Sequence, residues 1–134
     1  MSQLISQRDQ LLDAARKAVV HAHAPYSKFR VGAAVSTDKG IFVGVNVESA
    51  SLGLTLCAER TAIASAISNG ATVFHAIGLV CADASSPLSI TPCGACRQWL
   101  SEFMKPGAKI HVEGFNKPFT VGSLLPHSFK LKAS

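Results

Sequence analysis

The chain has 134 residues, of which 48% are hydrophobic, and a formal net charge of +5 at pH 7. This length fits one globular domain with a buried core and leaves no room for a second. The basic residues are scattered, with Arg16 and Lys17 as the only adjacent pair, and no basic stripe alternates with aromatic residues. This pattern argues against a nucleic-acid partner.

The chain also lacks the marks of membrane insertion and export. No apolar run approaches the roughly 18 residues of a membrane span. Residues 1–10 have neither the basic start nor the apolar block of a secretion signal. We therefore expect a cytoplasmic protein with no membrane partner, whose four cysteines are thiols or metal ligands rather than disulfides.

The first part of the chain predicts a helix followed by a hairpin. Apolar residues recur at helical spacing over residues 6–22, and Pro25 ends that helix. Residues 31–36 and 41–47 are β-like runs separated by the turn-forming segment 37–40. Together they predict an antiparallel β-hairpin.

Three residues near this hairpin could contact a ligand. Asn46 and Glu48 alternate at the end of the second strand, so their side chains should point the same way. An amide beside a carboxylate can hold a hydroxyl group or can satisfy the polar groups of a loop, and the spacing does not distinguish the two. Phe29 could belong to the core or stack on a flat ligand, and its position alone favours the core.

The middle of the chain predicts a second helix and a buried strand. Cys57 opens a helix that runs to about Ser68, where residues 69–70 give a left-handed stop. Residues 73–82 are nearly all apolar, as expected for the central strand of a sheet that is covered on both faces.

A third helix follows a loop over residues 83–90. Thr91 should cap it, with Pro92 in the first helical position. Cys93 and Cys96 then lie on one face of its first turn, and the helix should end at residues 106–107.

The C-terminal part completes an α/β pattern. Residues 109–113 predict a last strand, and residues 121–129 a short apolar element that leads to an aromatic residue. The order of elements predicts one α/β domain over residues 1–134, with a mixed central β-sheet sandwiched between helices.

The cysteines that begin the second and third helices suggest chemistry. A Cys-x-x-Cys pair alone is ambiguous, because redox sites, structural zinc sites and catalytic metal sites all use it. A structural zinc site normally needs a fourth protein ligand, and Cys81 lies in an apolar strand while no histidine is near either motif. Three thiolates with an open fourth position therefore predict a catalytic zinc site, in which Glu59 is placed to carry protons.

The segments Cys57-Ala58-Glu59 and Pro92-Cys93-Gly94-Ala95-Cys96 resemble those of the zinc-dependent cytidine deaminases of the small, homotetrameric type. The likeness extends from residues 26–34 to residues 124–129. It implies a cytidine-deaminase-like fold and hydrolytic deamination of cytidine and deoxycytidine to uridine and deoxyuridine in pyrimidine salvage. In that reaction zinc-bound hydroxide attacks C4 of the base and ammonia leaves.

The resemblance assigns the metal and proton-transfer roles. One zinc ion per chain would be bound by Cys57, Cys93 and Cys96, and Glu59 would shuttle protons from water to the ring and to the departing ammonia. Arg60 would temper the negative charge of the thiolates.

The resemblance also assigns the nucleoside contacts. Phe29 would pack against the pyrimidine, which reverses the preference for a core role. Asn46 and Glu48 would hold the ribose 3′-hydroxyl, and the backbone of Ala58 would help to hold the base. Phe129 would reach the pocket of a neighbouring subunit, so the implied partners are further copies of the chain in a homotetramer with shared pockets.

Two positions depart from the family pattern. Ser49 stands where Asn is usual, and Leu52 stands where Tyr or Phe is usual. Both lie in the loop before the first zinc ligand, so they bear on which nucleoside fits. The alternative function is therefore deamination of a modified cytosine nucleoside, such as a 4-substituted cytidine or an aminoacylnucleoside antibiotic. A polynucleotide-editing deaminase and a structural zinc or redox module are the other classes considered.

Overall fold

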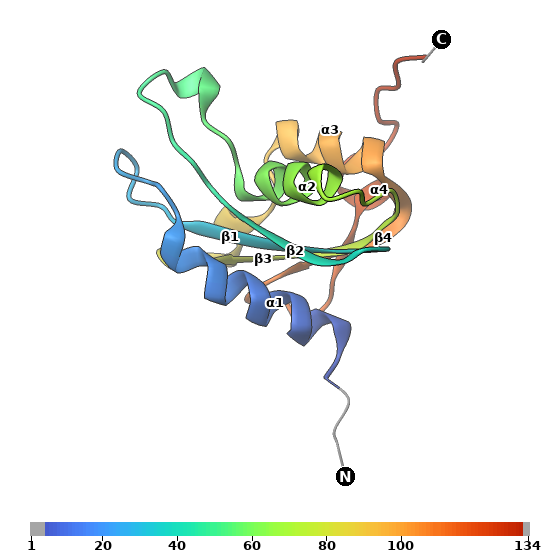
Figure 1. Cartoon of the computed structure of the whole chain (residues 1–134), viewed down its shortest axis with the longest axis horizontal. Helices are drawn as coiled ribbons and strands as arrows, with labels where there is room; N and C mark the ends of the chain where they lie inside the picture. Colours follow the sequence, from blue (N-terminus) through green and yellow to red (C-terminus); the bar gives the residue numbers. More distant parts are fainter. Residues whose placement is uncertain (1–4, 133–134) are drawn as a thin grey trace.

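A five-stranded sheet lies between helices in the computed structural model, which describes residues 5–132 (Figure 1). Residues 1–4, part of the N-terminal segment assessed for a signal, lie outside the described residues. The strand order is β2-β1-β3-β4-β5. The strands are β1 (Val31–Thr37), β2 (Gly40–Val45), β3 (Phe74–Cys81), β4 (Met104–Val112) and β5 (Phe119–Thr120).

The sheet is mixed, because β3 and β4 run parallel while the other neighbouring pairs are antiparallel. The β1–β2 hairpin is confirmed, with Gly32 opposite Val45 and Thr37 opposite Gly40. The predicted apolar strand is β3, which lies at the centre of the sheet and is buried except at His75. The predicted fold class is confirmed.

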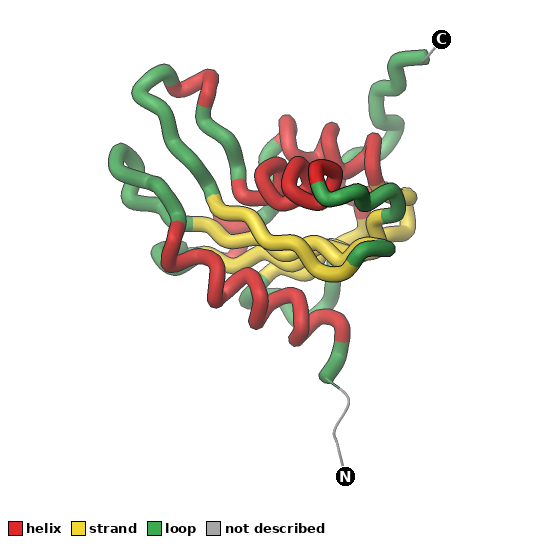
Figure 2. The backbone as a smooth tube through the Cα atoms, in the orientation of Figure 1, coloured by secondary structure: helices red, strands yellow, loops and turns green. Residues whose placement is uncertain are grey.

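Helices cover both faces of the sheet (Figure 2). Helix α1 (Gln7–Ala18) lies on one face and continues into the short 3-10 helix η1 (Val19–His21). Helices α2 (Ala58–Ser68) and α3 (Gly94–Phe103) lie on the other face. Among the described residues, no helix is long and apolar enough to cross a membrane.

The start of α3 differs from the prediction. Cys93 is the N-cap and the helix begins at Gly94, so the expected cap at Thr91 and first position at Pro92 are wrong. The preceding residues form the 3-10 helix η3 (Pro87–Ile90). Thr91 is instead the C-cap of η3, with ψ of 145°, and its hydroxyl donates to the Leu88 carbonyl at 2.8 Å.

The end of α3 also differs. The helix ends at Phe103, and β4 begins at the next residue. The register between β3 and β4 shifts from Phe74 opposite Met104 to Ala76 opposite Lys109. A bulge in β4 therefore takes up residues 106–107, which were expected to lie beyond the helix as a stop. The segment expected as a short apolar element forms β5 and α4 (Val121–Leu124).

Close packing fixes α2 against the edge strand β2. At Gly44 a Cβ atom would lie 2.6 Å from the Ala58 carbonyl oxygen and closer still to the backbone nitrogen of Ala62. The Thr61 hydroxyl donates to the Val45 carbonyl at 2.8 Å. The first turn of α2 is thus held directly on the sheet.

One buried polar side chain on β4 has no partner in residues 5–132. His111 is 6% exposed, and both of its ring nitrogens are buried without a hydrogen bond to any of these residues. Burial lowers the pKa of His111, and the positive charges of Arg8 and Lys109 lower it further. The imidazole is therefore neutral in the folded chain at neutral pH.

We expect His111 to make the fold less stable in mild acid. The unfolded chain binds a proton at this histidine below about pH 6.5, whereas the folded chain resists it, so the free energy of unfolding falls as the pH drops. One such group contributes at most about 1.4 kcal/mol per pH unit. Urea unfolding of the wild type and of His111→Leu, compared between neutral and mildly acidic pH, should show a smaller loss in the variant. The exposed His75→Gln is the control, and an equal acid loss in wild type and His111→Leu would contradict this role.

Candidate metal centre and substrate cavity

Three thiols meet where the N-termini of α2 and α3 approach each other. Cys57 is the N-cap of α2, Cys93 is the N-cap of α3, and Cys96 lies in the first turn of α3. Their sulfur atoms all lie within 4.8 Å of one another. This is the one group of metal-binding side chains found in the described part of the chain.

The spacing of the sulfur atoms suits a zinc ion. Zinc–sulfur bonds of about 2.3 Å in a tetrahedral site place neighbouring sulfurs about 3.8 Å apart. The Cys57 and Cys93 sulfurs are 3.8 Å apart. Thiolates are also the ligands that zinc prefers in proteins, so the geometry and the donor set both fit zinc.

The surroundings favour negative charge on the sulfur of Cys57. The neighbouring Cys96 thiol and Arg60 lower the pKa of the Cys57 thiol to about 5. The proximity of Cys57 and burial raise the pKa of Cys96. Arg60 places Nη2 at 3.6 Å from the Cys57 sulfur and 3.2 Å from the Thr55 carbonyl oxygen.

Arg97, the residue after Cys96, directs its side chain to backbone carbonyl groups. Its Nε donates to the Pro92 carbonyl at 2.7 Å, and its Nη1 donates to the Leu124 carbonyl at 3.0 Å. This side chain therefore ties the start of α3 to the end of α4.

Glu59 is the second residue of α2 and is 5% exposed. Burial raises the pKa of its carboxyl group to about 7, and the negative charge of Cys57 adds to the effect. A carboxyl group in this range can both accept and donate a proton near neutral pH.

A cavity of about 210 Å³ opens beside the thiols. The predicted site residues that line it are Phe29, Asn46, Cys57, Ala58, Glu59 and Cys93. Glu48, Arg60, Cys96 and Phe129 do not line it.

Five further residues line this cavity, and none of them was predicted from the sequence as a site residue: Val31, Thr55, Ser89, Ile90 and Thr91. Val31 could have been found, because it follows Phe29 by two residues and so shares its side of an extended segment. Ser89 and Ile90 come from η3, whose place in the cavity wall depends on tertiary packing.

The polar pair at the end of β2 supports the loop over residues 24–30. Asn46 Oδ1 accepts from the Val31 amide at 2.9 Å, and its Nδ2 donates to the Phe29 carbonyl at 2.7 Å. Glu48 accepts from the Tyr26 and Ser27 amides at 3.0 and 3.1 Å and from the Ser27 hydroxyl. Asn46 and Glu48 therefore do satisfy polar groups of a loop, which is one of the two roles that the sequence left open.

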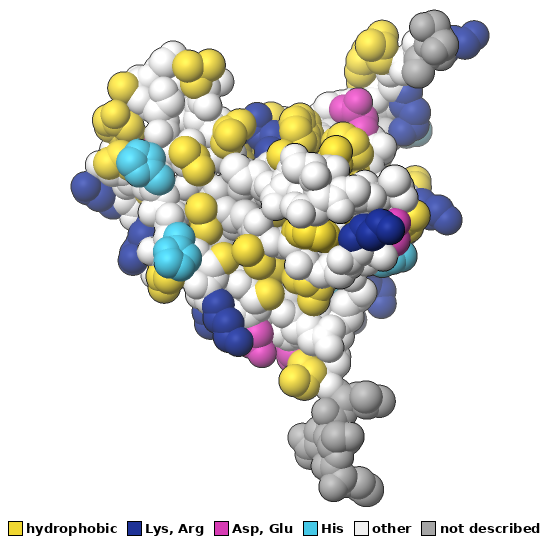
Figure 3. Space-filling view, in the orientation of Figure 1, with side chains coloured by type: hydrophobic (Ala, Val, Ile, Leu, Met, Phe, Trp, Pro, Cys, Tyr) yellow, Lys and Arg dark blue, Asp and Glu magenta, His cyan; other side chains and the backbone are white. Residues whose placement is uncertain are grey.

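Phe129 lies outside the cavity of its own chain. It is 67% exposed on the C-terminal tail, which leads away from the helices (Figure 1). Gln98 Nε2 donates to its carbonyl oxygen at 3.1 Å. Leu52 is 76% exposed in the 3-10 helix η2 (Leu52–Leu54), in a projecting loop that carries exposed hydrophobic side chains (Figure 3).

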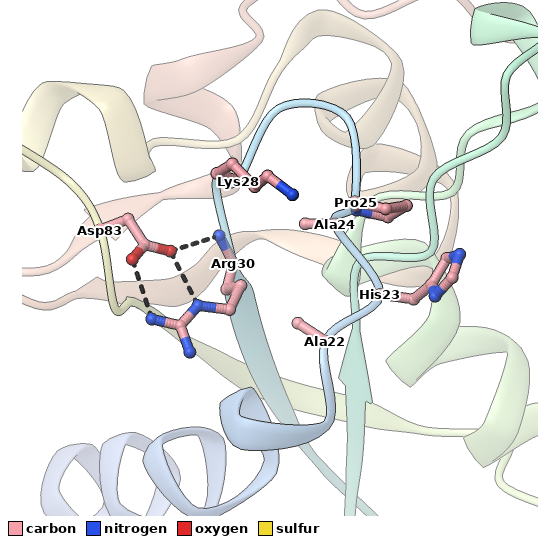
Figure 4. Close-up of a pocket in the computed structure, with 7 residues that line it drawn as sticks. All are labelled: Ala22, His23, Ala24, Pro25, Lys28, Arg30 and Asp83. Carbon is pink, nitrogen blue, oxygen red and sulfur yellow. Dashed lines mark hydrogen bonds and ion pairs between the residues drawn. The ribbon is translucent and has the colours of Figure 1, made fainter.

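A second cavity, of about 480 Å³, lies beside the loop over residues 24–30 (Figure 4). Lys28 and Arg30 line it, whereas Phe29 and Val31 line the first cavity, so this segment separates the two. Arg30 Nε and Nη2 donate to the Asp83 carboxylate at 3.0 and 2.9 Å. The Arg30 and Asp83 charges are paired with each other, and no cysteine is among the described residues that line the second cavity. It therefore lacks the cluster of thiols that could bind zinc beside the first cavity.

Known proteins similar to this chain are deaminases. The model of the cytidine and deoxycytidylate deaminase zinc-binding region matches residues 5–113. A probable cytidine deaminase of Dictyostelium discoideum is 52% identical over 71% of this chain and 64% of its own length. The cytidine deaminase of Sporosarcina psychrophila is 41% identical over 90% of both chains. The crystal structure of cytidine deaminase from Burkholderia pseudomallei is 43% identical with a TM-score of 0.83, and the match covers 93% of this chain and 100% of that one.

A weaker match bears on the alternative function. A blasticidin-S deaminase of Bacillus cereus is 35% identical over 91% of this chain and 92% of its own length. The cytidine deaminases above are more similar to this chain.

We expect zinc to depend on the clustered thiols. Purified wild-type chain should carry about one zinc ion, and Cys93→Ser should carry well under half of that, because one thiolate ligand is lost. Atomic absorption after gel filtration measures the ratio of zinc to protein. Cys81→Ala is the matched control, since Cys81 is buried in β3 away from the cluster. Full zinc in Cys93→Ser, or equal loss in both variants, would contradict this assignment.

Proposed function

The chain belongs to the cytidine and deoxycytidylate deaminase family, and we propose on this basis that it hydrolyses cytidine and deoxycytidine to uridine and deoxyuridine, releasing ammonia. The observation that carries the proposal is the meeting of three thiols and one buried carboxyl group at the wall of a single cavity.

The three thiols would hold one zinc ion per chain. Bound zinc supplies a Lewis acid that makes water a nucleophile at neutral pH. Cys57, Cys93 and Cys96 provide the ligand set, and the two helix N-termini stabilise their negative charge. Arg60 offsets part of that charge from 3.6 Å.

Glu59 would carry the protons of the reaction. It follows the ligand Cys57 by two residues and lines the cavity, so its carboxyl group faces the space where water and base meet. It would take a proton from the attacking water and deliver it to ring N3, then take the remaining proton from the new C4 hydroxyl group and deliver it to the exocyclic nitrogen, as the C4–N bond breaks and the C4 carbonyl forms. Water is consumed and ammonia leaves, which balances the hydrolysis.

The remaining walls would hold the nucleoside. Phe29 offers an aromatic face to the pyrimidine, and the Ala58 amide, at the first position of α2, has no partner within the helix and can bind the base. Asn46 keeps one hydrogen and one lone pair beyond its loop contacts, and Glu48, just outside the cavity lining, keeps one lone pair on Oε2, for the ribose 3′-hydroxyl.

Assembly and location belong to the same proposal. The exposed Phe129 would enter the pocket of a neighbouring copy in a homotetramer. Its 67% exposure and its absence from the lining of its own cavity support this. A cytoplasmic location accords with reduced cysteines, since none of the four forms a disulfide.

The alternative, deamination of a modified cytosine nucleoside, has one specific support. The relative named as a blasticidin-S deaminase matches nearly the whole chain at 35% identity. Leu52, at the position where an aromatic residue is usual, does not line the cavity of its own chain, so the support comes from this relative alone.

We expect the enzyme to prefer nucleosides over nucleotides. Among the described residues that line the 210 Å³ cavity there is no lysine or arginine, so a 5′-phosphate would lose its hydration without gaining a cationic partner. Loss of cytosine absorbance should be readily measured with cytidine, whereas kcat/KM for deoxycytidine 5′-monophosphate should be at least roughly 100-fold lower. No absorbance change with cytidine would contradict the proposed function. Equal kcat/KM for cytidine and deoxycytidine 5′-monophosphate would contradict the predicted preference for nucleosides.

A further inference from the structure

The loop that carries Phe29 into the cavity is a tight turn. The Lys28 amide donates to the Ala24 carbonyl at 3.0 Å, and Lys28 has φ of 61°, in the left-handed region that residues with a side chain adopt at some cost. Such a conformation persists only when its surroundings hold it. The position of Phe29 therefore depends on the contacts made by the turn.

A single hydroxyl group lies at the centre of those contacts. Ser27 Oγ donates to Glu48 Oε2 and accepts from the Phe29 amide at 3.0 Å. The other oxygen of Glu48 accepts from the Tyr26 and Ser27 amides. One side chain thus links a carboxylate after β2 to the backbone of the aromatic residue in the cavity.

Asn46 completes the hold from the other side. Its amide contacts the Phe29 carbonyl and the Val31 amide, so the backbone of Phe29 is held at its nitrogen by Ser27 and at its oxygen by Asn46. Ser27 itself does not line the cavity. Any effect it has on substrate must act through Phe29 and Glu48.

We propose that Ser27 is a positioning residue that sets both the aromatic wall of the nucleoside site, Phe29, and the carboxylate of Glu48, which lies beside that site and is assigned to the ribose. This inference rests on the proposed function, because it assigns Phe29 and Glu48 to substrate. A hydroxyl suits the task because it donates to the carboxylate and accepts from the amide at the same time. The Ser27 hydroxyl also lowers the pKa of Glu48, which keeps the carboxylate ionised as an acceptor at neutral pH.

The test is a comparison of KM and kcat for cytidine in Ser27 variants. Ser27→Ala removes both bonds, and KM should rise roughly tenfold, as expected for loss of about one hydrogen bond to a charged group, while kcat changes by less than about threefold. Ser27→Thr keeps the hydroxyl and should stay within about threefold of wild type in KM. In a Glu48→Ala background the further effect of Ser27→Ala should shrink, since one of the two linked groups is already gone.

Ser6→Ala is the matched control. Ser6 Oγ also accepts one backbone amide bond, from Asp9 at 3.1 Å, but it caps α1 on the opposite face of the sheet. Its loss should lower the melting temperature and leave KM unchanged.

Each other outcome has a definite meaning. An active wild type with an unchanged KM in Ser27→Ala, or an undiminished effect in the Glu48→Ala background, would overturn this inference alone. Failure of Ser27→Ala to fold would also overturn it, because the hydroxyl would then serve folding. An inactive wild type would remove the proposed function and this inference with it.

Discussion

The convergence of two helix N-termini on one face of the sheet is the constraint on which the site depends. Helices α2 and α3 each begin at a cysteine, and their packing brings three sulfur atoms within 4.8 Å. Three thiolates repel one another, so this arrangement requires positive potential, which the helix ends and Arg60 provide. The contact of Gly44 with α2 keeps the first helix end in place.

The same packing buries Glu59 and shapes the cavity. A carboxyl group in the first turn of α2 faces the cavity only because the N-terminus of α2 lies over the sheet beside η3 and the loop over residues 24–30. That loop in turn depends on Asn46 and Glu48, which lie just after β2. The three thiols, Glu59 and the cavity walls thus meet where the starts of α2 and α3, the 3-10 helix η3 and the loop over residues 24–30 come together.

The sequence predicted the parts of this fold that local patterns determine. Apolar periodicity located α1, the hairpin and β3, because their hydrophobic faces are buried against each other. The cysteine spacing predicted the cluster, since two cysteines three residues apart at a helix start lie on one face. The roles of the substrate residues came from resemblance and remain predictions.

Local patterns failed where distant segments decide the conformation. Thr91 and Pro92 have the chemistry of a helix start, yet Thr91 bonds back to η3 and the helix begins at Gly94. Pro106 was predicted to end α3 but lies within β4, in the segment where the register between β3 and β4 shifts. Two further features depend on segments that meet only in the folded chain. One is the position of Ser89 and Ile90 in the cavity wall, and the other is the hydrogen bond from Ser27 to Glu48.

The central claim is that Glu59 carries protons beside a metal held by the three cysteines. The most direct measurement compares turnover of cytidine and zinc content in Glu59→Gln, which keeps the shape and burial of the side chain but cannot exchange the proton. The account predicts that zinc stays near one ion per chain while kcat falls by at least roughly 100-fold, with the exposed Glu102→Gln unchanged in both. Wild-type turnover in zinc-loaded Glu59→Gln would contradict it.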